Sequence, residues 1–501
     1  MRADVLKERL ESAGLLASWP PGLSEQFAAV TTDSRSVQAG GLFVAYEGTT
    51  ADGHAFVPAA VAGGASAVVV EHHLSGVSAP QIRVTNGRLA AAVAAALFHG
   101  EPARTLHLVA VTGTNGKTTT THLLRHLFGA AQPAGSIGTL GAIDGTGRVV
   151  PGTGALTTPG PVELQAALAA LQTSGCTTVA MEASSHSLDQ DRLWGLTFRA
   201  AVFTNLTRDH LDYHETEEKY LAAKLRLSSY LAPGGWEIVN ADDPAWRRLP
   251  SRGAGEAERL TFGVDRPADV RAGDIAGDAT GMRFLLTANG KRAPVRLPLL
   301  GRFNVENALG AAAAAIALGG GGGGGGGDVE AVAERLGSAP QVPGRMERLA
   351  ASPCVVLRDY AHTPDALERA LAALRPLTAG RLIVVFGCGG DRDRGKRPVM
   401  GAIAARDADL AILTSDNPRT ESPDRILDDV EQGMGETAHL RIVDRRQAIG
   451  RALTIARADD VVVLAGKGHE AYQVIGTEKL PFDERDVVAD AVKLLAREGG
   501  A

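Results

Sequence analysis

Cysteine is scarce in this sequence. Only Cys176, Cys354 and Cys388 occur among 501 residues. They have none of the spacings of a zinc site, and three cysteines are too few for a disulfide framework. Long apolar runs and a basic-then-apolar leader are also lacking, so the sequence predicts neither a transmembrane span nor a secretory signal. We therefore expect a cytoplasmic protein.

An excess of positive charge is lacking as well. The formal net charge is −6, so no overall positive field favours nucleic acid as a partner. Hydrophobic residues make up 45% of the chain, which is enough for several cores, and this length suggests about three domains. We expect small-molecule partners and a monomer.

A glycine-rich loop is the most informative feature present. Residues 111–120 read Val-Thr-Gly-Thr-Asn-Gly-Lys-Thr-Thr-Thr, after an apolar run at 108–111 and before a stretch with helical spacing at 121–128. Strand, glycine loop, lysine and helix in this order are typical of a phosphate-binding loop. The spacing Gly-x-x-Gly-Lys-Thr is two residues shorter than the loop of motor ATPases and GTPases.

Four residues of this loop have predicted roles in phosphate binding. Gly113 and Gly116 let backbone N–H groups approach an anion without interference from a Cβ atom. Lys117 can reach the terminal phosphates, and the hydroxyl group of Thr118 can bind Mg²⁺. An ordinary glycine turn is the alternative, and the Lys-Thr pair argues against it.

The pattern along the chain predicts an α/β protein with three domains, at residues 1–103, 104–338 and 339–501. From about residue 340, near-continuous apolar strands alternate with helices, which indicates a parallel sheet covered on both faces. The predicted strands are 41–45, 67–70, 108–111, 178–182, 200–205, 237–240, 355–357, 382–386, 410–413 and 461–464. The predicted helices are 87–99, 121–128, 215–231, 305–318, 364–374, 397–406 and 423–433. Nine glycines at 319–327 indicate a flexible surface loop.

Three further features of the central region bear on chemistry. Glu182 ends a predicted strand, where a carboxylate is either a metal ligand or a solvated loop acid. Two histidines and two aspartates lie within 209–214, which suggests metal or phosphate contacts, although either histidine alone is more often structural. Lys224 has mostly apolar neighbours in a predicted helix. Burial would lower the pKa of its amine and favour the neutral form. The residue pattern alone, however, favours a lysine whose side chain extends to solvent.

Three strand ends in the last region carry unusual residues. Residues 387–393, 416–419 and 466–470 each follow a predicted strand and contain arginine, lysine, aspartate or glutamate. Arginine can hold a carboxylate and an acid can hold an ammonium group, so together they suggest a pocket for a zwitterion. Taken singly, each is also compatible with solvated loop charges.

Taken together, these motifs resemble the Mur ligase family, ATP-dependent amide-forming enzymes of peptidoglycan precursor synthesis. The resemblance covers nearly the whole chain. The shared motifs are Gly-Thr-Asn-Gly-Lys-Thr-Thr-Thr at 113–120, Leu-Thr-Thr-Pro at 156–159, Glu-x-Ser-Ser-His at 182–186, Asn-Leu-x-x-Asp-His-Leu-Asp-x-His at 205–214, Lys224, Gly-Arg-Phe-Asn-Val at 301–305, Val-Pro-Gly-Arg-Met-Glu-Arg at 342–348, Asp-Tyr-Ala-His-Thr-Pro at 359–364 and Ala-Gly-Lys-Gly-His-Glu at 465–470. The chain looks most like the branch that adds a diamino acid to UDP-N-acetylmuramoyl-L-alanyl-D-glutamate.

The resemblance implies a small N-terminal uridine-binding α/β domain, a central P-loop ATPase-like domain with a mostly parallel sheet, and a C-terminal Rossmann-like domain. It implies ATP as a substrate and Mg²⁺ as a cofactor. The implied ATP-binding residues are Gly113, Thr114, Asn115, Gly116, Lys117, Thr118, Thr119, Asn304, Arg345 and Asp359. The implied catalytic residues are Lys117, Glu182, His210 and Lys224; the implied metal ligands are Thr118, Glu182, His210 and Lys224, the last as a carbamylated lysine (N6-carboxylysine).

The two other substrate sites are implied in the same way. The residues for the UDP-muramoyl dipeptide are Thr32, Ser34, Thr157, Thr158, Ser184, Gln190 and Arg192. The residues for the diamino acid are Arg392, Asp416, Asn417, Pro418, Arg419, Gly466 and Glu470. Residues 48–53 match a variable uridine-binding stretch, so contacts at Thr49 and Thr50 are left open. The glycine run departs from the family pattern, and we expect it to affect order and not chemistry.

Asp416-Asn-Pro-Arg419 matches the family signature for meso-diaminopimelate. Arg419 would bind the second carboxylate, a group that lysine lacks, and such a contact is worth about 1.5–3 kcal/mol or roughly a ten- to hundredfold preference. L-lysine and L-ornithine remain alternatives.

Three rival functions fit part of the pattern. Folylpolyglutamate synthetase shares a similar loop, but the Thr-Asp-Ser-Arg segment at 32–35 and Asp-Asn-Pro-Arg argue against it. A P-loop kinase or motor ATPase disagrees with the short loop and the zwitterion pocket. A non-catalytic nucleotide-binding protein would be expected to lack Lys117, Glu182 or Lys224, and all three are present.

Overall fold

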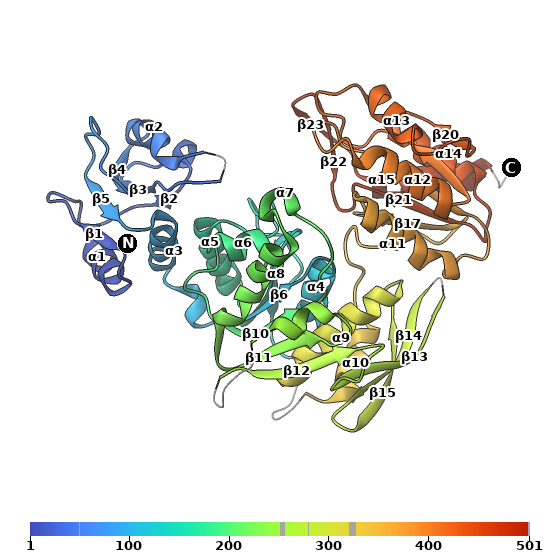
Figure 1. Cartoon of the computed structure of the whole chain (residues 1–501), viewed down its shortest axis with the longest axis horizontal. Coiled ribbons are helices and arrows are strands. Elements are labelled where there is room, and N and C mark those ends of the chain that lie inside the picture. Colours follow the sequence, from blue (N-terminus) through green and yellow to red (C-terminus); the bar gives the residue numbers. More distant parts are fainter. Residues whose placement is uncertain (50, 251–255, 279, 320–326, 499–501) are drawn as a thin grey trace. The chain divides into compact units, whose positions relative to one another are not determined.

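The chain folds into three large β-sheets with helices packed against them (Figure 1). The computed structural model describes residues 1–49, 51–250, 256–278, 280–319 and 327–498. The predicted α/β class is confirmed. Seven of the nine glycines at 319–327 lie outside the described residues, so the interpretation of that run as a surface loop stays a prediction.

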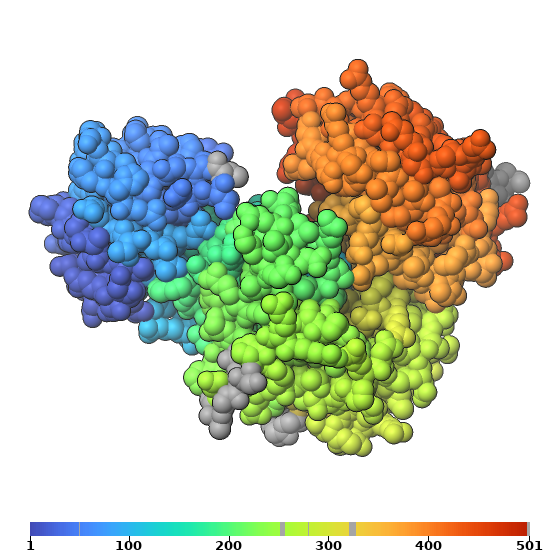
Figure 2. Space-filling model, viewed as in Figure 1, coloured from blue at the N-terminus to red at the C-terminus, as the bar shows by residue number. Residues whose placement is uncertain are grey.

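The chain divides into two compact units. The first contains Met1–Arg271, Leu286–Ala293 and Glu306–Arg335, and the second contains Ala272–Leu285, Pro294–Val305 and Leu336–Ala501. The first unit therefore includes both the N-terminal sheet and most of the central one. In the second unit, the residues from about 350 onward, coloured orange to red, form one continuous body (Figure 2). The predicted boundaries at residues 103 and 338 remain a proposal.

The N-terminal sheet has the strand order β1-β5-β4-β3-β2. Strands β2 to β5 are parallel, and β1 pairs with β5 in the antiparallel direction. Its elements are α1 (Ala3–Ser12), β1 (Leu16–Ser18), β2 (Val30–Thr31), β3 (Gly41–Val44), α2 (Val57–Ala62), β4 (Ala65–Val70), β5 (Gln81–Val84) and α3 (Gly87–Phe98). Asn86 begins α3 by accepting the N–H of Leu89 at 3.0 Å, the usual role of an N-cap.

The central sheet has ten strands in the order β15-β14-β13-β12-β11-β10-β6-β9-β7-β8. Its strands are β6 (His107–Thr112), β7 (Ala134–Gly138), β8 (Gly141–Ile143), β9 (Thr178–Glu182), β10 (Phe198–Phe203), β11 (Leu231–Asn240), β12 (Glu258–Gly263), β13 (Val270–Asp278), β14 (Gly281–Ala288) and β15 (Lys291–Leu297). Its helices are α4 (Lys117–Phe128), α5 (Pro161–Thr173), α6 (Ser185–Asp189), α7 (Leu211–His214), α8 (Glu217–Leu225), α9 (Arg302–Ala317) and α10 (Val329–Gly337). The neighbours β10, β6 and β9 run parallel, so the loops that follow them meet at one edge.

The predicted helix at 215–231 is too long at both ends. Thr216 caps α8 by accepting the N–H of Lys219, and Glu215 before it has a φ of +66°. After Leu225 the chain tightens into a 3₁₀ turn, Arg226–Tyr230, in which Ser229 Oγ donates to the carbonyl of Arg226. Serine side chains compete for backbone hydrogen bonds in this way, and β11 begins directly afterwards.

Strands β12 to β15 were not predicted, although the sequence carries a signal for the last two. Burial alternates along β15, and β14 ends just before Asn289-Gly290. Both of these turn residues have a positive φ, 51° and 74°. Asn-Gly between alternating strands is typical of a tight hairpin.

The C-terminal sheet has the order β16-β17-β21-β18-β19-β20, and a separate hairpin pairs β22 with β23. Its strands are β16 (Glu347–Ala350), β17 (Val355–Asp359), β18 (Leu382–Phe386), β19 (Leu410–Leu413), β20 (His439–Arg441), β21 (Val461–Ala465), β22 (Tyr472–Ile475) and β23 (Glu478–Pro481). Its helices are α11 (Pro364–Leu374), α12 (Lys396–Asp407), α13 (Pro423–Glu431), α14 (Arg445–Ile455) and α15 (Glu484–Glu498).

Strand β18 shows why this sheet is covered on both faces. All five of its residues are buried. Leu382, Val384 and Phe386 pack in a cluster with α11, α12 and α13, whereas Ile383 and Val385 pack in another with α14 and α15. Because successive side chains point to opposite faces, a continuous apolar strand needs both layers, as predicted. In the described part of the chain, no helix is long and apolar enough to cross a membrane.

A buried ion pair joins the helices on one face. Arg445 and Glu484 have fully buried side chains, and Arg445 Nε donates to Glu484 Oε1 at 2.8 Å. Arg445 Nη2 also donates to the carbonyl of Ala465 at 2.9 Å, at the end of β21. Burial raises the pKa of Glu484, and the neighbouring Arg445 opposes that rise.

We predict that Arg445→Met destabilises the C-terminal sheet and its helices by about 3–5 kcal/mol, because it leaves a buried carboxylate without its partner. Calorimetric and urea unfolding would measure the change. The matched control is Arg446→Met, whose side chain is 58% exposed and lies 3.9 Å from Asp490; its effect should stay below about 0.5 kcal/mol. Equal effects of the two substitutions would contradict the prediction.

Candidate active site

The glycine loop between β6 and α4 is shaped by what surrounds it. Gly113 has a φ of +149° and Gly116 a φ of +84°. A Cβ atom on Gly113 would lie 1.9 Å from Thr204 Oγ1, and one on Gly116 would lie 2.1 Å from Asn307 Oδ1. Positive φ and lack of space together restrict both positions to glycine.

The two residues that follow β10, Thr204 and Asn205, hold the loop in place through hydrogen bonds. The N–H of Thr114 donates to the carbonyl of Asn205 at 2.7 Å, and the N–H of Asn115 donates to Asn205 Oδ1 at 2.8 Å. Thr204 Oγ1 donates in turn to the carbonyl of Asn115 at 2.7 Å. Asn205, the first residue of the 205–214 motif, therefore helps to set the loop's conformation.

Two lysines share one carbonyl of this loop. Lys117 Nζ donates to the carbonyl oxygens of Gly113 at 3.0 Å and Thr114 at 2.9 Å. Lys224 Nζ donates to the same Gly113 oxygen at 2.8 Å. Burial, and next the positive charge of Lys117, lower the pKa of Lys224 well below its usual value, against a smaller opposing effect of Asp209.

The residue pattern alone favours a lysine that extends to solvent at position 224, and that interpretation is wrong. Its side chain is 1% exposed and its Nζ lies 4.5 Å from the ring centre of Tyr220. Tyr220 also bonds through its hydroxyl group to Thr114 Oγ1 at 3.0 Å. The spacing of four residues between Tyr220 and Lys224 places both on one face of α8, facing the loop.

Glu182 is a buried acid and not a solvated one. It is 1% exposed, and its Oε1 accepts the N–H of Thr139 at 2.8 Å. Thr118 Oγ1 donates to Oε2 at 3.2 Å. A hydroxyl and a carboxylate oxygen so close together match the ligand preferences of Mg²⁺. No group of three His, Cys, Asp or Glu side chains suited to a metal occurs among the described residues.

His210 lies near this pair of lysines in a ring cluster. It has a φ of +54°, and its ring centre is 4.8 Å from that of His186. Burial lowers the pKa of His210, with smaller contributions in the same direction from Lys117 and Lys224. Burial and the neighbouring histidines lower the pKa of His186 to about 4. Both rings are therefore expected to be neutral near pH 7.

A cavity of about 410 Å³ opens within the first unit. Three residues assigned to the UDP-muramoyl substrate, Thr32, Gln190 and Arg192, line it. Arg192 donates to Gln190 Oε1 through Nε at 3.0 Å and to the carbonyl of Thr158 at 2.8 Å. Its position is thus set by two other predicted residues.

The remaining predicted residues of this group are not on the cavity lining. Thr158 Oγ1 donates to the carbonyl of Glu182 at 2.8 Å and lies 3.3 Å from Ser184 Oγ. Thr157 Oγ1 accepts from Thr139 at 3.3 Å. Thr139 also contacts Glu182 Oε2 at 3.3 Å, so it links Thr157 to the Glu182 carboxylate, whereas Thr158 contacts the backbone of Glu182. Ser34 begins a short 3₁₀ turn capped by Asp33.

Tyr46, Arg88 and Glu163 also line the cavity and were missed from the sequence. The guanidinium carbon of Arg88 lies 5.1 Å from the ring centre of Tyr46, and Arg88 Nη1 donates to the carbonyl of Gln190 at 3.2 Å. Arg88 lies in the first turn of an alanine-rich helix, where a charged residue has no distinctive pattern. Only the tertiary structure places it beside Gln190.

Three residues assigned to ATP lie in the second unit. Asn304 is buried and donates through Nδ2 to the carbonyl of Leu300 at 2.7 Å. Asp359, at the end of β17, accepts the N–H of Met346 at 2.7 Å; burial raises its pKa, against the charge of Arg345. The guanidinium of Arg345 lies 4.9 Å from the ring centre of Tyr360.

The loops after β18, β19 and β21 meet, as predicted, because these strands are neighbours in the order β21-β18-β19. A Cβ atom on Gly466 would lie 2.5 Å from Asp416 Oδ2. Asn417 Nδ2 donates to Glu470 Oε2 at 2.9 Å, and the fully buried Lys467 donates to Asn417 Oδ1 at 3.1 Å. Lys467 was not among the predicted site residues.

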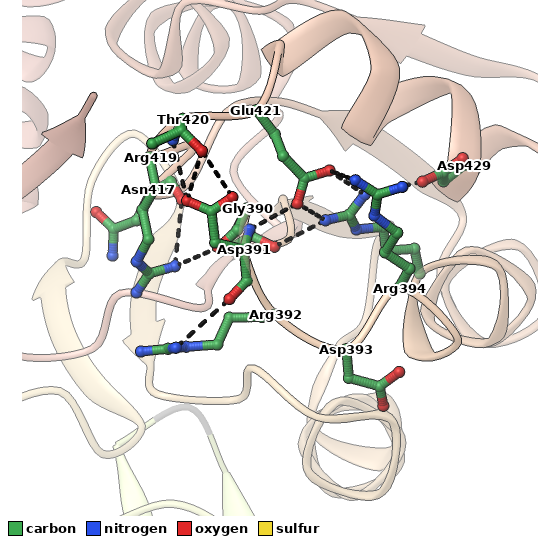
Figure 3. Close-up of polar contacts among 12 residues, drawn as sticks. Gly390, Asp391, Arg392, Asp393, Arg394, Asn417, Arg419, Thr420, Glu421 and Asp429 are labelled. Atoms are coloured by element: carbon green, nitrogen blue, oxygen red, sulfur yellow. Dashed lines mark hydrogen bonds and ion pairs between the residues drawn. The ribbon is translucent and has the colours of Figure 1, made fainter. Parts of the chain in front are cut away.

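Arg419 and Arg392 extend from two of these loops (Figure 3). Arg419 has a φ of +50° and donates through Nη1 to the carbonyl of Gly390 at 2.8 Å. Arg392 donates weakly to the carbonyl of Asp391 at 3.4 Å. In the described part of the chain, Nε and Nη2 of Arg419 make no hydrogen bond, so this edge of the fork is available to a ligand.

Three family models match successive parts of the chain. "Mur ligase family, catalytic domain" matches residues 26–110, "Mur ligase middle domain" residues 111–315, and "Mur ligase, glutamate ligase domain" residues 344–468. A UDP-N-acetylmuramoyl-L-alanyl-D-glutamate--2,6-diaminopimelate ligase of Gloeobacter violaceus is 45% identical over 498 residues, covering 98% of this chain and 99% of that protein. The chain belongs to the Mur ligase family.

Solved structures of the Mur ligase fold agree with this assignment. A structure of a UDP-N-acetylmuramoyl-L-alanyl-D-glutamate--2,6-diaminopimelate ligase matches with a TM-score of 0.66 and 36% identity, over 94% of this chain and 96% of that one. A Mycobacterium tuberculosis folylpolyglutamate synthase complexed with ADP matches with a TM-score of 0.61 and 18% identity, over 81% of this chain and 94% of that one. The second likeness shows the fold alone.

We predict that Gly113→Ala weakens ATP binding by about ten- to a hundredfold, because forcing the loop out of its conformation costs about 1–3 kcal/mol. Titration calorimetry with a non-hydrolysable ATP analogue would measure this. Gly450→Ala is the control, since a Cβ atom there meets nothing within 4 Å. Unchanged affinity in Gly113→Ala would show that this loop does not hold the nucleotide.

Proposed function

We propose that this Mur ligase joins meso-diaminopimelate to the D-glutamyl γ-carboxylate of UDP-N-acetylmuramoyl-L-alanyl-D-glutamate, with ATP converted to ADP and phosphate. The observation that carries the proposal is the near full-length similarity to diaminopimelate ligases, combined with an arginine fork at Arg419 that has one open edge. The substrates are small molecules, and we place the enzyme in the cytoplasm as a monomer.

The proposed reaction has two steps. The γ-carboxylate of the dipeptide attacks the γ-phosphate of ATP, which gives an acyl phosphate and ADP. The amine of the diamino acid then attacks the acyl carbon, loses a proton, and displaces phosphate as the amide forms. Both steps need water to be excluded, since an acyl phosphate hydrolyses readily.

ATP would bind at the loop Gly113–Thr119 of the first unit. Asn304, Arg345 and Asp359 of the second unit are proposed as nucleotide contacts by their match to the family motifs. Backbone N–H groups of the loop and Lys117 would offset the charge on the transferred phosphoryl group. In the structure Lys117 donates to two loop carbonyls, so its ammonium group is held within the loop that would surround the phosphates.

Thr118, Glu182, His210 and carbamylated Lys224 would hold Mg²⁺, which would neutralise phosphate charge when bound. The contact between Thr118 and Glu182 fits this assignment. The low pKa of Lys224 supports carbamylation, because CO₂ reacts with a neutral amine. A carbamate would also replace repulsion from Lys117 by attraction.

The UDP-muramoyl dipeptide would bind in the 410 Å³ cavity and along the edge that leads to Glu182. Its proposed contacts are Thr32, Ser34, Thr157, Thr158, Ser184, Gln190 and Arg192. The diamino acid would bind at Arg392, Asp416, Asn417, Pro418, Arg419, Gly466 and Glu470. Three sheets and three successive family models support domains at 1–103, 104–338 and 339–501.

L-lysine and L-ornithine are the alternative amino acids. They lack the second carboxylate, so they would leave the open edge of Arg419 unpaired. A folylpolyglutamate synthetase reaction is the other alternative; the Thr-Asp-Ser-Arg segment at 32–35 and the Asp-Asn-Pro-Arg loop argue against it.

Phosphate release with ATP, Mg²⁺ and UDP-N-acetylmuramoyl-L-alanyl-D-glutamate tests the proposal. We expect turnover with meso-diaminopimelate, and Arg419→Ala should reduce the preference for it over L-lysine by roughly ten- to a hundredfold. Arg425→Ala, an exposed change in α13, is the control. Turnover mainly with lysine or ornithine would overturn the role of Arg419, and no turnover with any would overturn the proposed reaction.

Carbamylation of Lys224 is tested separately. In ¹³C-bicarbonate we expect one slowly exchanging carbamate signal by NMR, because burial protects it from hydrolysis. The signal should vanish in Lys224→Arg, along with nearly all activity, and persist in Lys219→Arg, a change at an exposed lysine in the same helix. A signal that survives Lys224→Arg would place the carbamate elsewhere.

A further inference from the structure

Two loops of the C-terminal sheet are joined by a network of charged side chains. Loop A, residues 387–394, follows β18, and loop B, residues 416–421, follows β19. Loop A carries Arg392 and loop B carries Arg419, the two arginines assigned above to the diamino acid. Figure 3 shows both guanidinium groups pointing to the same side, away from Glu421 and Asp429.

Backbone contacts bring the two loops together. The N–H of Gly390 donates to the carbonyl of Asn417 at 3.0 Å, and a Cβ atom on Gly390 would lie 1.9 Å from the carbonyl oxygen of Pro418. Arg419 Nη1 donates back to the carbonyl of Gly390 at 2.8 Å. The position of the Arg419 guanidinium therefore depends on where loop A lies.

Glu421 connects both loops to α12. Its Oε1 accepts the N–H of Asp391 at 2.6 Å and Arg397 Nη2 at 2.9 Å. Its Oε2 lies 3.0 Å from Arg394 and 3.1 Å from Arg397 Nη1. These contacts, Arg397 foremost, lower the pKa of Glu421 to about 2, so the carboxylate is ionised at neutral pH.

Arg397 is the fully buried member of the network. Besides Glu421 it donates to the carbonyl of Gly389 at 3.2 Å and to Asp429 at 2.8 Å. Its Nε has no partner in the described structure. A buried guanidinium requires charged partners, and most of its hydrogen bonds go to residues of loops A and B.

A second contact, exposed to solvent, joins loops A and B. Asp391, with a φ of +53°, accepts Thr420 Oγ1 at 2.8 Å and the N–H of Thr420 at 3.1 Å. This link is exposed to solvent, so replacing Thr420 should disturb folding much less than replacing Arg397.

We propose that Arg397 and Glu421 are positioning residues for amino-acid selection: they hold loops A and B in register, so that Arg392 and Arg419 face the second carboxylate of the diamino acid together. The proposal rests on the function proposed above. It makes selectivity depend on two residues that do not touch the substrate. None of the hydrogen bonds of Arg397 and Glu421 described above involves a residue assigned to ATP, so we expect little effect on phosphoryl transfer.

The test compares Glu421→Gln with Thr420→Val and Asp429→Asn in the full-length enzyme. Glu421→Gln should raise the KM for meso-diaminopimelate about tenfold and lower its preference over L-lysine by a similar factor. Its kcat and its KM for ATP should change less than about threefold. Thr420→Val should act in the same direction with about a threefold effect.

Asp429→Asn is the matched control, because Asp429 contacts Arg397 without touching either loop. It should leave the amino-acid preference within about twofold. If Asp429→Asn changes selectivity as much as Glu421→Gln, selectivity does not depend on the contacts that join loops A and B, and the proposal is overturned. Unchanged selectivity in both Glu421→Gln and Thr420→Val would overturn it as well.

Hydrogen exchange in the absence of substrates separates this proposal from the proposed function. The amide of Asp391, which donates to Glu421, should exchange at least about tenfold faster in Glu421→Gln. If wild-type enzyme does not ligate diaminopimelate, the function fails whatever the exchange result. If ligation occurs but the exchange of loop A is unchanged, the positioning role fails alone.

Discussion

The carbonyl oxygen of Gly113 accepts hydrogen bonds from two lysines, and much of the central site depends on this arrangement. Two ammonium groups on one oxygen repel each other, and one of them, Lys224, is also buried. This repulsion is removed if the Lys224 amine is neutral or carbamylated. The conformation of the glycine loop, the position of α8 and the lowered pKa of Lys224 are thus parts of one electrostatic constraint.

In both units, neighbouring parallel strands bring the candidate site residues together. In the central sheet the loops after β9, β6 and β10 bring Glu182, Gly113 and Asn205 together. In the C-terminal sheet the loops after β21, β18 and β19 do the same for Gly466, loop A and loop B. Each set is adjacent because its three strands are neighbours, which is the usual location of ligands in open α/β sheets. A ligase that binds three substrates can therefore be built from repeated use of one structural rule.

The positioning role proposed for Arg397 and Glu421 would separate selectivity from catalysis. Arg392 and Arg419 would meet the substrate, but the network behind them contains a buried guanidinium and an acid of low pKa. Such networks are rigid because each buried charge requires its partners. Rigidity is most important for a guanidinium group that binds a carboxylate through two parallel hydrogen bonds.

The sequence by itself determined the α/β class, the approximate positions of the strands and helices that we predicted from it, and the order of strand, glycine loop and helix at 107–128. These features depend on local patterns of apolar residues, glycine and lysine. The sequence did not reveal the ends of α8 or the remaining strands, β12–β15 among them. It also missed the contacts of Arg88, Arg397 and Lys467 with residues distant in sequence. It also favoured a solvated Lys224. Tertiary structure alone decided that question, because the pKa and reach of a charged side chain depend on burial and on charges brought in from other strands.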